Sequence, residues 1–137
     1  MEQQKETINS ASQNMTDADI QTKAEITPEI REQIEAKIKQ IKTEKNLKKV
    51  YAIVVQGDDG DDKPFYIGYF KRPSFSGFSM WANQVQKDSI VANKLLAEHC
   101  FVGGDSEVYK DDDLFCFGTM QHISDLIESR KSDLVKL

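Results

Sequence analysis

Two cysteines and two histidines carry the most reactive side chains in this chain of 137 residues. Cys100 and Cys116 form no Cys-x-x-Cys pair, and together with His99 and His122 they lack the spacing of a four-ligand zinc site. His99 and Cys100 are neighbours, but consecutive side chains on a helix diverge by about 100°, so they cannot work as a nucleophile and its base. Both cysteines are expected to be reduced core thiols, although spacing alone leaves one disulfide between them open.

A loop with four aspartates, GDDGDD at 57–62, could offer carboxylate oxygens to a calcium ion. An EF-hand loop requires ligands at its first, third and fifth positions and glycine at the sixth. With Gly60 as that glycine, Val55 is first and Gly57 is third, and only Asp59 fits. The loop is therefore predicted to be a hairpin turn in which both glycines adopt positive φ, with at most weak cation binding.

No other pattern brings catalytic groups together. The chain has no G-x-S-x-G, H-E-x-x-H or kinase motif, and its second cluster of aspartates is the run at 111–113. Carboxylate pairs that hydrolyse glycosides lie about 5 to 10 Å apart across a cleft, whereas these acids have the positions of a turn and a helix cap. We therefore expect no enzyme, no cofactor and no metal.

An amphipathic helix is predicted at 27–46. Thr27 offers an N-cap hydroxyl, Pro28 suits the first helical position, and Asn46 can end the helix. A narrow apolar stripe runs along it at spacings of four, four and three residues: Ile30, Ile34, Ile38 and Ile41. Such a stripe can dock on its own domain, on a second copy or on a partner, and these four isoleucines are the predicted partner-binding residues.

The rest of the chain predicts an α+β fold, with one antiparallel β-hairpin covered by about three C-terminal helices. β-branched and aromatic residues indicate strands at 50–55 and 65–70. Caps and glycines delimit the helices, which are expected to begin after Pro73 at Ser74 or Ser76, to run from Asp88 to Gly103 and Gly104, and to span 114–135. Their predicted inward faces hold Phe78, Trp81, Ala82 and Val85; Val91, Leu95 and Leu96; and Ile123, Leu126, Ile127, Leu134 and Leu137.

Length and composition fit one domain, since about 100 to 200 residues per domain is usual. Residues 1–26 are polar and are expected to form a disordered tail ahead of the helix at 27–46 and a small α+β domain at 47–137. The net charge of −5 divides into −3 for 1–26, +3 for 27–56 and −5 for 57–137, without the concentrated basic face of a nucleic-acid binder. The sequence has neither a secretory signal nor an apolar run of membrane-spanning length, so no membrane partner is expected.

Three segments follow one another in a recognisable order: YIGYFKRP at 66–73, LLAEHCFVGGD at 95–105, and KDDDLF at 110–115 ahead of a C-terminal DLVKL. Together they resemble the small tail assembly chaperones of bacteriophages, over about residues 50–137. The resemblance implies a non-catalytic protein of the host cytoplasm that binds the tape-measure protein and recruits tail-tube subunits during virion assembly. It supplies no catalytic residues and does not extend to the helix at 27–46.

Two other interpretations stay open. The protein could be a small structural or packaged component of the virion, with the helix at 27–46 forming the seam of a homo-oligomer. It could also be a small enzyme, or an inhibitor of a host enzyme that uses the aspartate loop as its contact surface.

Overall fold

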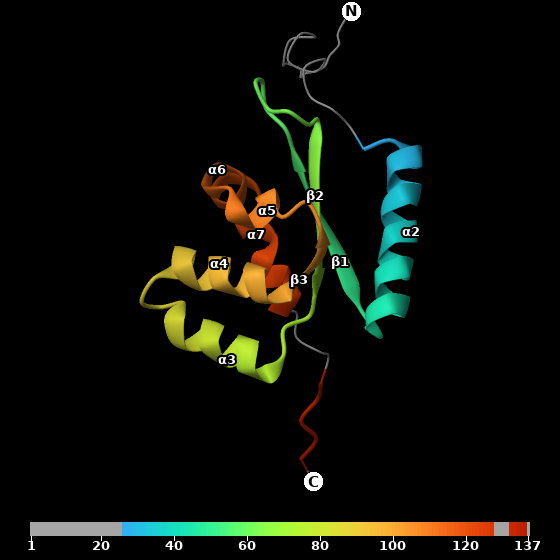
Figure 1. Ribbon diagram of the computed structural model, residues 1–137. Helices are drawn as coiled ribbons and strands as arrows, with labels where there is room; N and C mark the ends of the chain where they lie inside the picture. Colours follow the sequence, from blue (N-terminus) through green and yellow to red (C-terminus); the bar gives the residue numbers. More distant parts are fainter. Residues whose placement is uncertain (1–25, 128–131, 137) are drawn as a thin grey trace, which may run out of the picture.

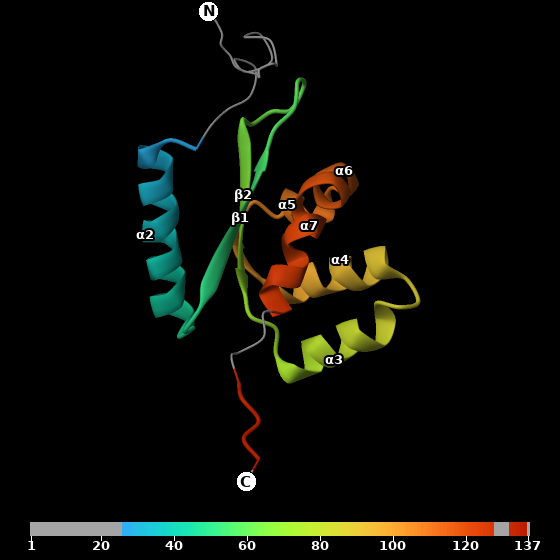
Figure 2. The same ribbon diagram turned by 180° about the vertical axis from the view of Figure 1, so that it is seen from behind.

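A computed structural model describes residues 26–127 and 132–136, and it has the expected α+β class (Figure 1). One helix, α2, covers one face of a three-stranded antiparallel sheet, and all the later helices lie on the other face (Figures 1 and 2). The elements in chain order are α2 (Pro28–Lys45), β1 (Val50–Gln56), β2 (Phe65–Lys71), α3 (Phe75–Gln84), α4 (Ser89–Cys100), β3 (Phe101–Gly104), α5 (Glu107–Lys110), α6 (Asp112–Leu114), the π-helical turn η1 (Phe115–Thr119), α7 (Met120–Ile123) and the 3₁₀ turn η2 (Ser124–Ile127).

The helices begin at the predicted capping residues. The Thr27 hydroxyl accepts a hydrogen bond from the Ile30 amide, and the Asp88 carboxylate accepts one from the Val91 amide at 3.1 Å. The Asp111 carboxylate caps α6 by accepting hydrogen bonds from the backbone amides two and three residues further along the chain. These side chains satisfy backbone N–H groups that have no partner within their own helix.

The sheet has a strand that the sequence did not reveal. β1 and β2 pair in one continuous register, from Val50 opposite Lys71 to Gln56 opposite Phe65, and β3 then pairs with the other edge of β2. The prediction that Gly103 and Gly104 simply stop a helix is wrong, because α4 ends at Cys100 and the glycines lie in β3. A segment of four residues with two glycines has too little strand propensity to be recognised in the sequence. Its hydrogen bonds to β2 are what stabilise it as a strand.

The aspartate loop is the predicted hairpin connection, but its two glycines have different roles. Gly60 adopts φ +93°, as expected, whereas Gly57 is absent from the positive-φ positions of the described chain. A Cβ added at Gly57 would overlap the carbonyl oxygen of Lys63, and the Gly57 amide donates to the Pro64 carbonyl at 2.8 Å. Gly57 is therefore needed for close backbone approach, not for its φ angle.

The core has two parts, one on each face of the sheet. Beneath the later helices lie the most completely buried side chains: Phe70, Phe115, Leu96, Ile123, Leu126 and Val108. Between α2 and the sheet, Ile41, Val50 and Tyr69 form a smaller cluster. The sheet is therefore buried on both faces, and the C-terminal helices supply most of the cover.

The prediction of one helix over 114–135 is wrong. The segment breaks into α6, η1, α7 and η2, and the described residues 132–136 beyond them are without helix. The break follows from packing: Gly118 lies against Val55 where a Cβ would collide with that side chain, and the Thr119 hydroxyl donates to the Val108 carbonyl at 2.6 Å. A π-helical turn widens the helix at this point and buries Thr119 fully.

The remaining predictions concern the two ends of the chain, where only part of the sequence is described. Leu134 of the predicted inward face is 84% exposed, and Leu137 and all of the predicted disordered tail except Ile26 lie outside the described residues. Among the helices that are described, none has the length and apolar character needed to cross a membrane.

Candidate protein-binding surface

The helical hairpin α3 and α4 presents large apolar side chains to solvent. Of the ten large hydrophobic residues that are exposed in the described chain, six lie on these two helices, and we call them the α3–α4 surface: Phe75, Phe78, Met80, Ile90, Val91 and Leu95. Phe75 is 86% exposed. The α3 sequence FSGFSMWANQ has no charged residue, although 30% of the whole chain is charged. Aromatic residues and methionine without charge are typical of the centre of a protein–protein interface.

The sequence prediction that these faces point inward is wrong for most of the residues concerned. Phe78 and Ala82 of α3 are exposed, as are Val91 and Leu95 of α4, and only Leu96 of that set is buried. Helical periodicity locates an apolar face, but it does not reveal whether the chain itself covers that face.

Trp81 fixes the two helices of the hairpin to each other. Its ring is half-buried, packs against the main core and lies 5.9 Å from the Phe78 ring. The indole N–H donates to the Asn93 side-chain oxygen of α4 at 2.8 Å. The exposed apolar residues thus stand on a rigid support, which lowers the entropy that binding would cost.

His99 has a structural position at the base of this hairpin. Its ring lies against Gly77, where any Cβ would collide with it, and its Nε2 is 3.1 Å from the Ser74 hydroxyl. The same hydroxyl caps α3 by accepting from the Gly77 amide. The ring therefore helps to hold the start of α3 against the end of α4.

The predicted partner-binding isoleucines lie mainly against the protein's own sheet. Ile41 is 3% exposed in the small cluster with Val50 and Tyr69, and Ile34 and Ile38 pack against the same cluster. Ile30, near the start of α2, is half-buried. Intramolecular docking, one of the three roles open for the stripe, is thus observed, while binding of a partner by these residues stays a prediction.

Both cysteines are free thiols, and Cys100 lies in unreactive surroundings. Cys100 is fully buried, and this burial raises its pKa to about 11, against a smaller lowering by the charge of Lys71. At neutral pH this thiol is protonated and therefore a poor nucleophile. Within the described residues, no three His, Cys, Asp or Glu side chains gather closely enough to hold a metal ion.

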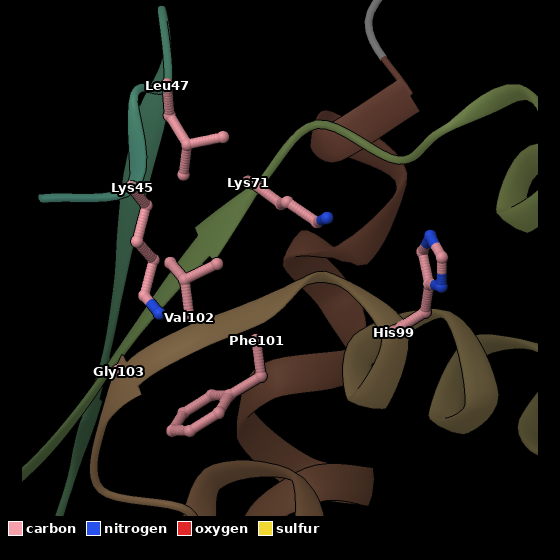
Figure 3. Close-up of a pocket in the computed structure, with 7 residues that line it drawn as sticks. All are labelled: Lys45, Leu47, Lys71, His99, Phe101, Val102 and Gly103. Atoms are coloured by element: carbon pink, nitrogen blue, oxygen red, sulfur yellow. The ribbon is translucent and has the colours of Figure 1, made fainter. Parts of the chain in front are cut away.

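A basic hollow lies where the ends of α2, β2 and α4 approach one another. It has a volume of about 680 Å³ and is lined by Lys45, Leu47, Lys71, His99, Phe101, Val102 and Gly103. Lys71 lies between Lys45 and Leu47 on one side and His99 on the other (Figure 3). Neither lysine forms an ion pair with another described residue, so the hollow has the charge to attract an anionic group but no buried polar group that would fix one.

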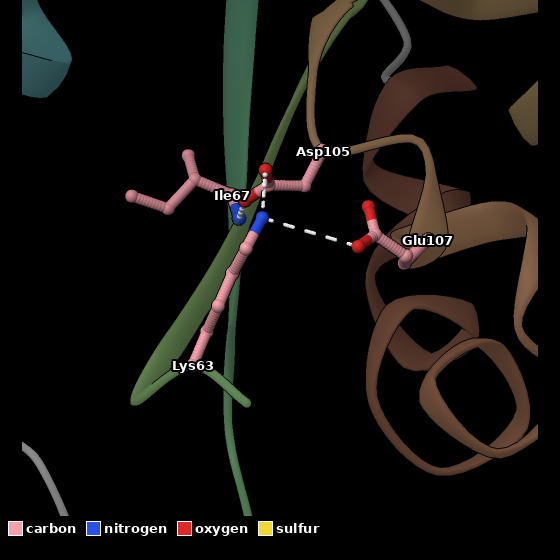
Figure 4. A network of polar contacts seen from close by, with 4 residues as sticks. All are labelled: Lys63, Ile67, Asp105 and Glu107. Atoms are coloured by element: carbon pink, nitrogen blue, oxygen red, sulfur yellow. Dashed lines mark hydrogen bonds and ion pairs between the residues drawn. The ribbon is translucent and has the colours of Figure 1, made fainter. Parts of the chain in front are cut away.

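The Asp105 side chain links the β1–β2 hairpin to the turn that follows β3 (Figure 4). Its carboxylate accepts from the Lys63 ammonium at 2.8 Å and from the Ile67 amide at 2.9 Å, and Glu107 lies 3.9 Å from the same ammonium. Burial raises the pKa of Asp105, but the hydrogen bonds from Lys63 and Ile67 and the charge of Lys63 together lower it below its usual value. The network therefore has a structural role: it holds the turn after β3 against the β1–β2 hairpin.

Replacing Asp105 by alanine is expected to lower the free energy of unfolding by about 1 to 3 kcal/mol at pH 7, because the Ile67 amide loses its acceptor. The folded-state pKa is depressed, so the carboxylate stabilises the fold above its unfolded pKa of about 3.9, and this contribution fades as pH falls through the folded value. In urea unfolding, the difference in the free energy of unfolding between variant and wild type should therefore be smaller at pH 3 than at pH 7.

Asp112→Ala is the matched control for that change. Asp112 also pairs with a lysine, Lys94, at 2.6 Å, but its side chain is 87% exposed. Exposed ion pairs contribute little to stability because solvent screens them, so this variant should unfold close to the wild type. An equal loss in the free energy of unfolding in the two variants would show that the hydrogen bonds of Asp105 do not stabilise the fold.

Comparison with known proteins assigns the chain to no family. No protein-family model matches it, and a search of curated proteins gave no match. An uncharacterised protein from Bacillus stearothermophilus has a solved structure that is 17% identical, covers 71% of this chain and 99% of its own, and superposes with a TM-score of 0.44. So low a score carries no argument about function.

Proposed function

We propose that the protein is a non-catalytic binding factor that holds an apolar segment of a partner protein on the α3–α4 surface. The observation that carries the proposal is the exposure of six large apolar side chains on one rigid hairpin. Each square ångström of apolar surface removed from water contributes about 25 cal/mol, so a partner that covers these side chains gains binding free energy from their burial. The buried, protonated thiol of Cys100 is consistent with a role without covalent chemistry.

The partner we propose is a structural protein of a bacteriophage tail, either the tape-measure protein or a tail-tube subunit, bound in the host cytoplasm during assembly. The support is the resemblance of residues 50–137 to tail assembly chaperones together with the α3–α4 surface. An assembly chaperone must shield apolar segments of a partner before they reach their final contacts, and an uncharged surface of Phe, Met, Ile and Leu suits that task.

Co-expression with the tape-measure protein of the same phage tests the proposal. The wild type should raise the soluble yield of the tape-measure protein and co-purify with it. The double variant Phe75→Ser, Met80→Ser should weaken capture by at least about tenfold, since truncating a hot-spot side chain of an interface costs about 2 kcal/mol or more. Both side chains are more than half exposed, so the fold should be little affected.

The matched control is Phe117→Ser, Val135→Ser, which removes two apolar side chains from outside the α3–α4 surface, both of them more exposed than Met80. Capture by this control should equal that of the wild type. Unchanged capture by the α3–α4 variant would refute the binding site, and no co-purification of tape-measure or tail-tube protein with the wild type would refute the function. A chaperone should also be missing from purified virions, so its detection there by mass spectrometry in stoichiometric amounts would favour a structural component.

A further inference from the structure

Among the described residues, β1 is an edge strand without the charges, proline or bulge that commonly protect an edge. The strand order β1-β2-β3 leaves β1 with a single strand partner among the described residues, and helices cover both faces of the sheet (Figures 1 and 2). Its sequence VYAIVVQ contains no charge, proline or glycine, and its register with β2 has no bulge. The other edge, β3, is only four residues long, contains two glycines and pairs through a bulge. β1 is therefore the edge that can accept another strand.

Open space runs along this edge. A hollow of about 310 Å³ is bordered by the four consecutive residues Tyr51, Ala52, Ile53 and Val54, and by His122, Asp125 and Leu126 from α7 and η2. Successive side chains of a strand point to opposite faces of a sheet, so a hollow bordered by four in succession lies along the side of the strand.

The two ends of β1 carry opposite charges. Lys48 and Lys49 precede the strand, and Asp58 and Asp59 follow it in the aspartate loop. All four side chains are exposed, and none forms an ion pair with another described residue. A strand that is basic at its start and acidic at its end is complementary to a second copy of itself running in the opposite direction.

We infer that two copies of the chain pair through β1, antiparallel, about a two-fold axis at Ile53, and form one continuous six-stranded sheet. Ile53 is the middle residue of β1, so residues equally far before and after it lie opposite each other. Lys49 then lies opposite Gly57, and Lys48 lies opposite Asp58 of the second copy. The same contacts recur at the other end of the interface, which gives the aspartate loop a role beyond turning the chain.

Charge reversal at the two ends of β1 tests this interface in the full chain by sedimentation velocity. The wild type should be a dimer that weakens as salt is raised. The variant Lys48→Glu, Lys49→Glu and the variant Asp58→Lys, Asp59→Lys each place like charges at both ends, so each should weaken dimerisation by about tenfold or more. Mixed in equal amounts, the two variants should form a heterodimer, because every end then pairs opposite charges again.

The control variant Lys87→Glu, Lys136→Glu makes the same change in net charge as the variant Lys48→Glu, Lys49→Glu, at exposed sites outside β1 and its flanking residues, and should dimerise like the wild type. A wild type that stays monomeric at millimolar concentration would overturn the inference. So would dimers that persist in both charge-reversed variants, since they would place the interface elsewhere, for example on the helix at 27–46. Failure of the mixed variants to associate would refute the antiparallel pairing.

Discussion

Replacing Gly104 by alanine is expected to lower the free energy of unfolding by about 2 to 5 kcal/mol, a large part of the roughly 5 to 15 kcal/mol typical of a domain. Gly104 has φ +94°, a conformation that costs other L-residues about 1 to 2 kcal/mol. An added Cβ would also overlap the carbonyl oxygen of Ile67, and making room in packed structure costs about 1 to 3 kcal/mol more. That carbonyl accepts a hydrogen bond from the Asp105 amide at 2.8 Å, so the collision would also disturb the position of Asp105.

Gly60→Ala separates the two causes of this loss. Gly60 has almost the same φ, +93°, but an added Cβ would meet no atom within 4 Å. Its expected loss is the backbone strain alone, about 1 to 2 kcal/mol. Urea denaturation midpoints of both variants provide the measurement, and equal shifts would mean that Gly104 is not held close to Ile67.

Phe115→Ala should lower the free energy of unfolding by about 3 to 5 kcal/mol, the usual cost of truncating a large buried aromatic residue. Phe115 is completely buried at the start of the π-helical turn, in the core cluster with Phe70 and Ile123. The cavity left by the ring would be surrounded by side chains from the sheet and from α4 and α7, which cannot all move to fill it.

Phe117, two residues later in the same turn, provides the comparison for Phe115. It is 81% exposed, so Phe117→Ala should change stability by no more than about 0.5 kcal/mol. Thermal or chemical unfolding of the two variants thus tests which side of the turn faces the core. Similar losses for the two phenylalanines would contradict the opposite facing of Phe115 and Phe117 in this turn.

Local signals in the sequence determined where elements begin and which class of fold they form. Thr27, Asp88 and Asp111 act through hydrogen bonds to amides two or three residues away, so their effect does not depend on the rest of the molecule. The hairpin of β1 and β2 follows equally from strand propensity and a short turn with Gly60 at positive φ. Such features were predicted correctly because their causes lie within a few residues of the chain.

Tertiary structure alone decided the third strand, the π-helical turn and the candidate binding surface. β3 exists because β2 offers it a hydrogen-bonding edge, and the turn at 115–119 exists because Gly118 must pass Val55. The apolar periodicity of α3 and α4 predicted a buried face, yet Phe78, Val91 and Leu95 remain in solvent. The hydrophobic effect acts on any apolar face but does not specify what covers it, and only the packed arrangement of the whole chain reveals that this one is left uncovered.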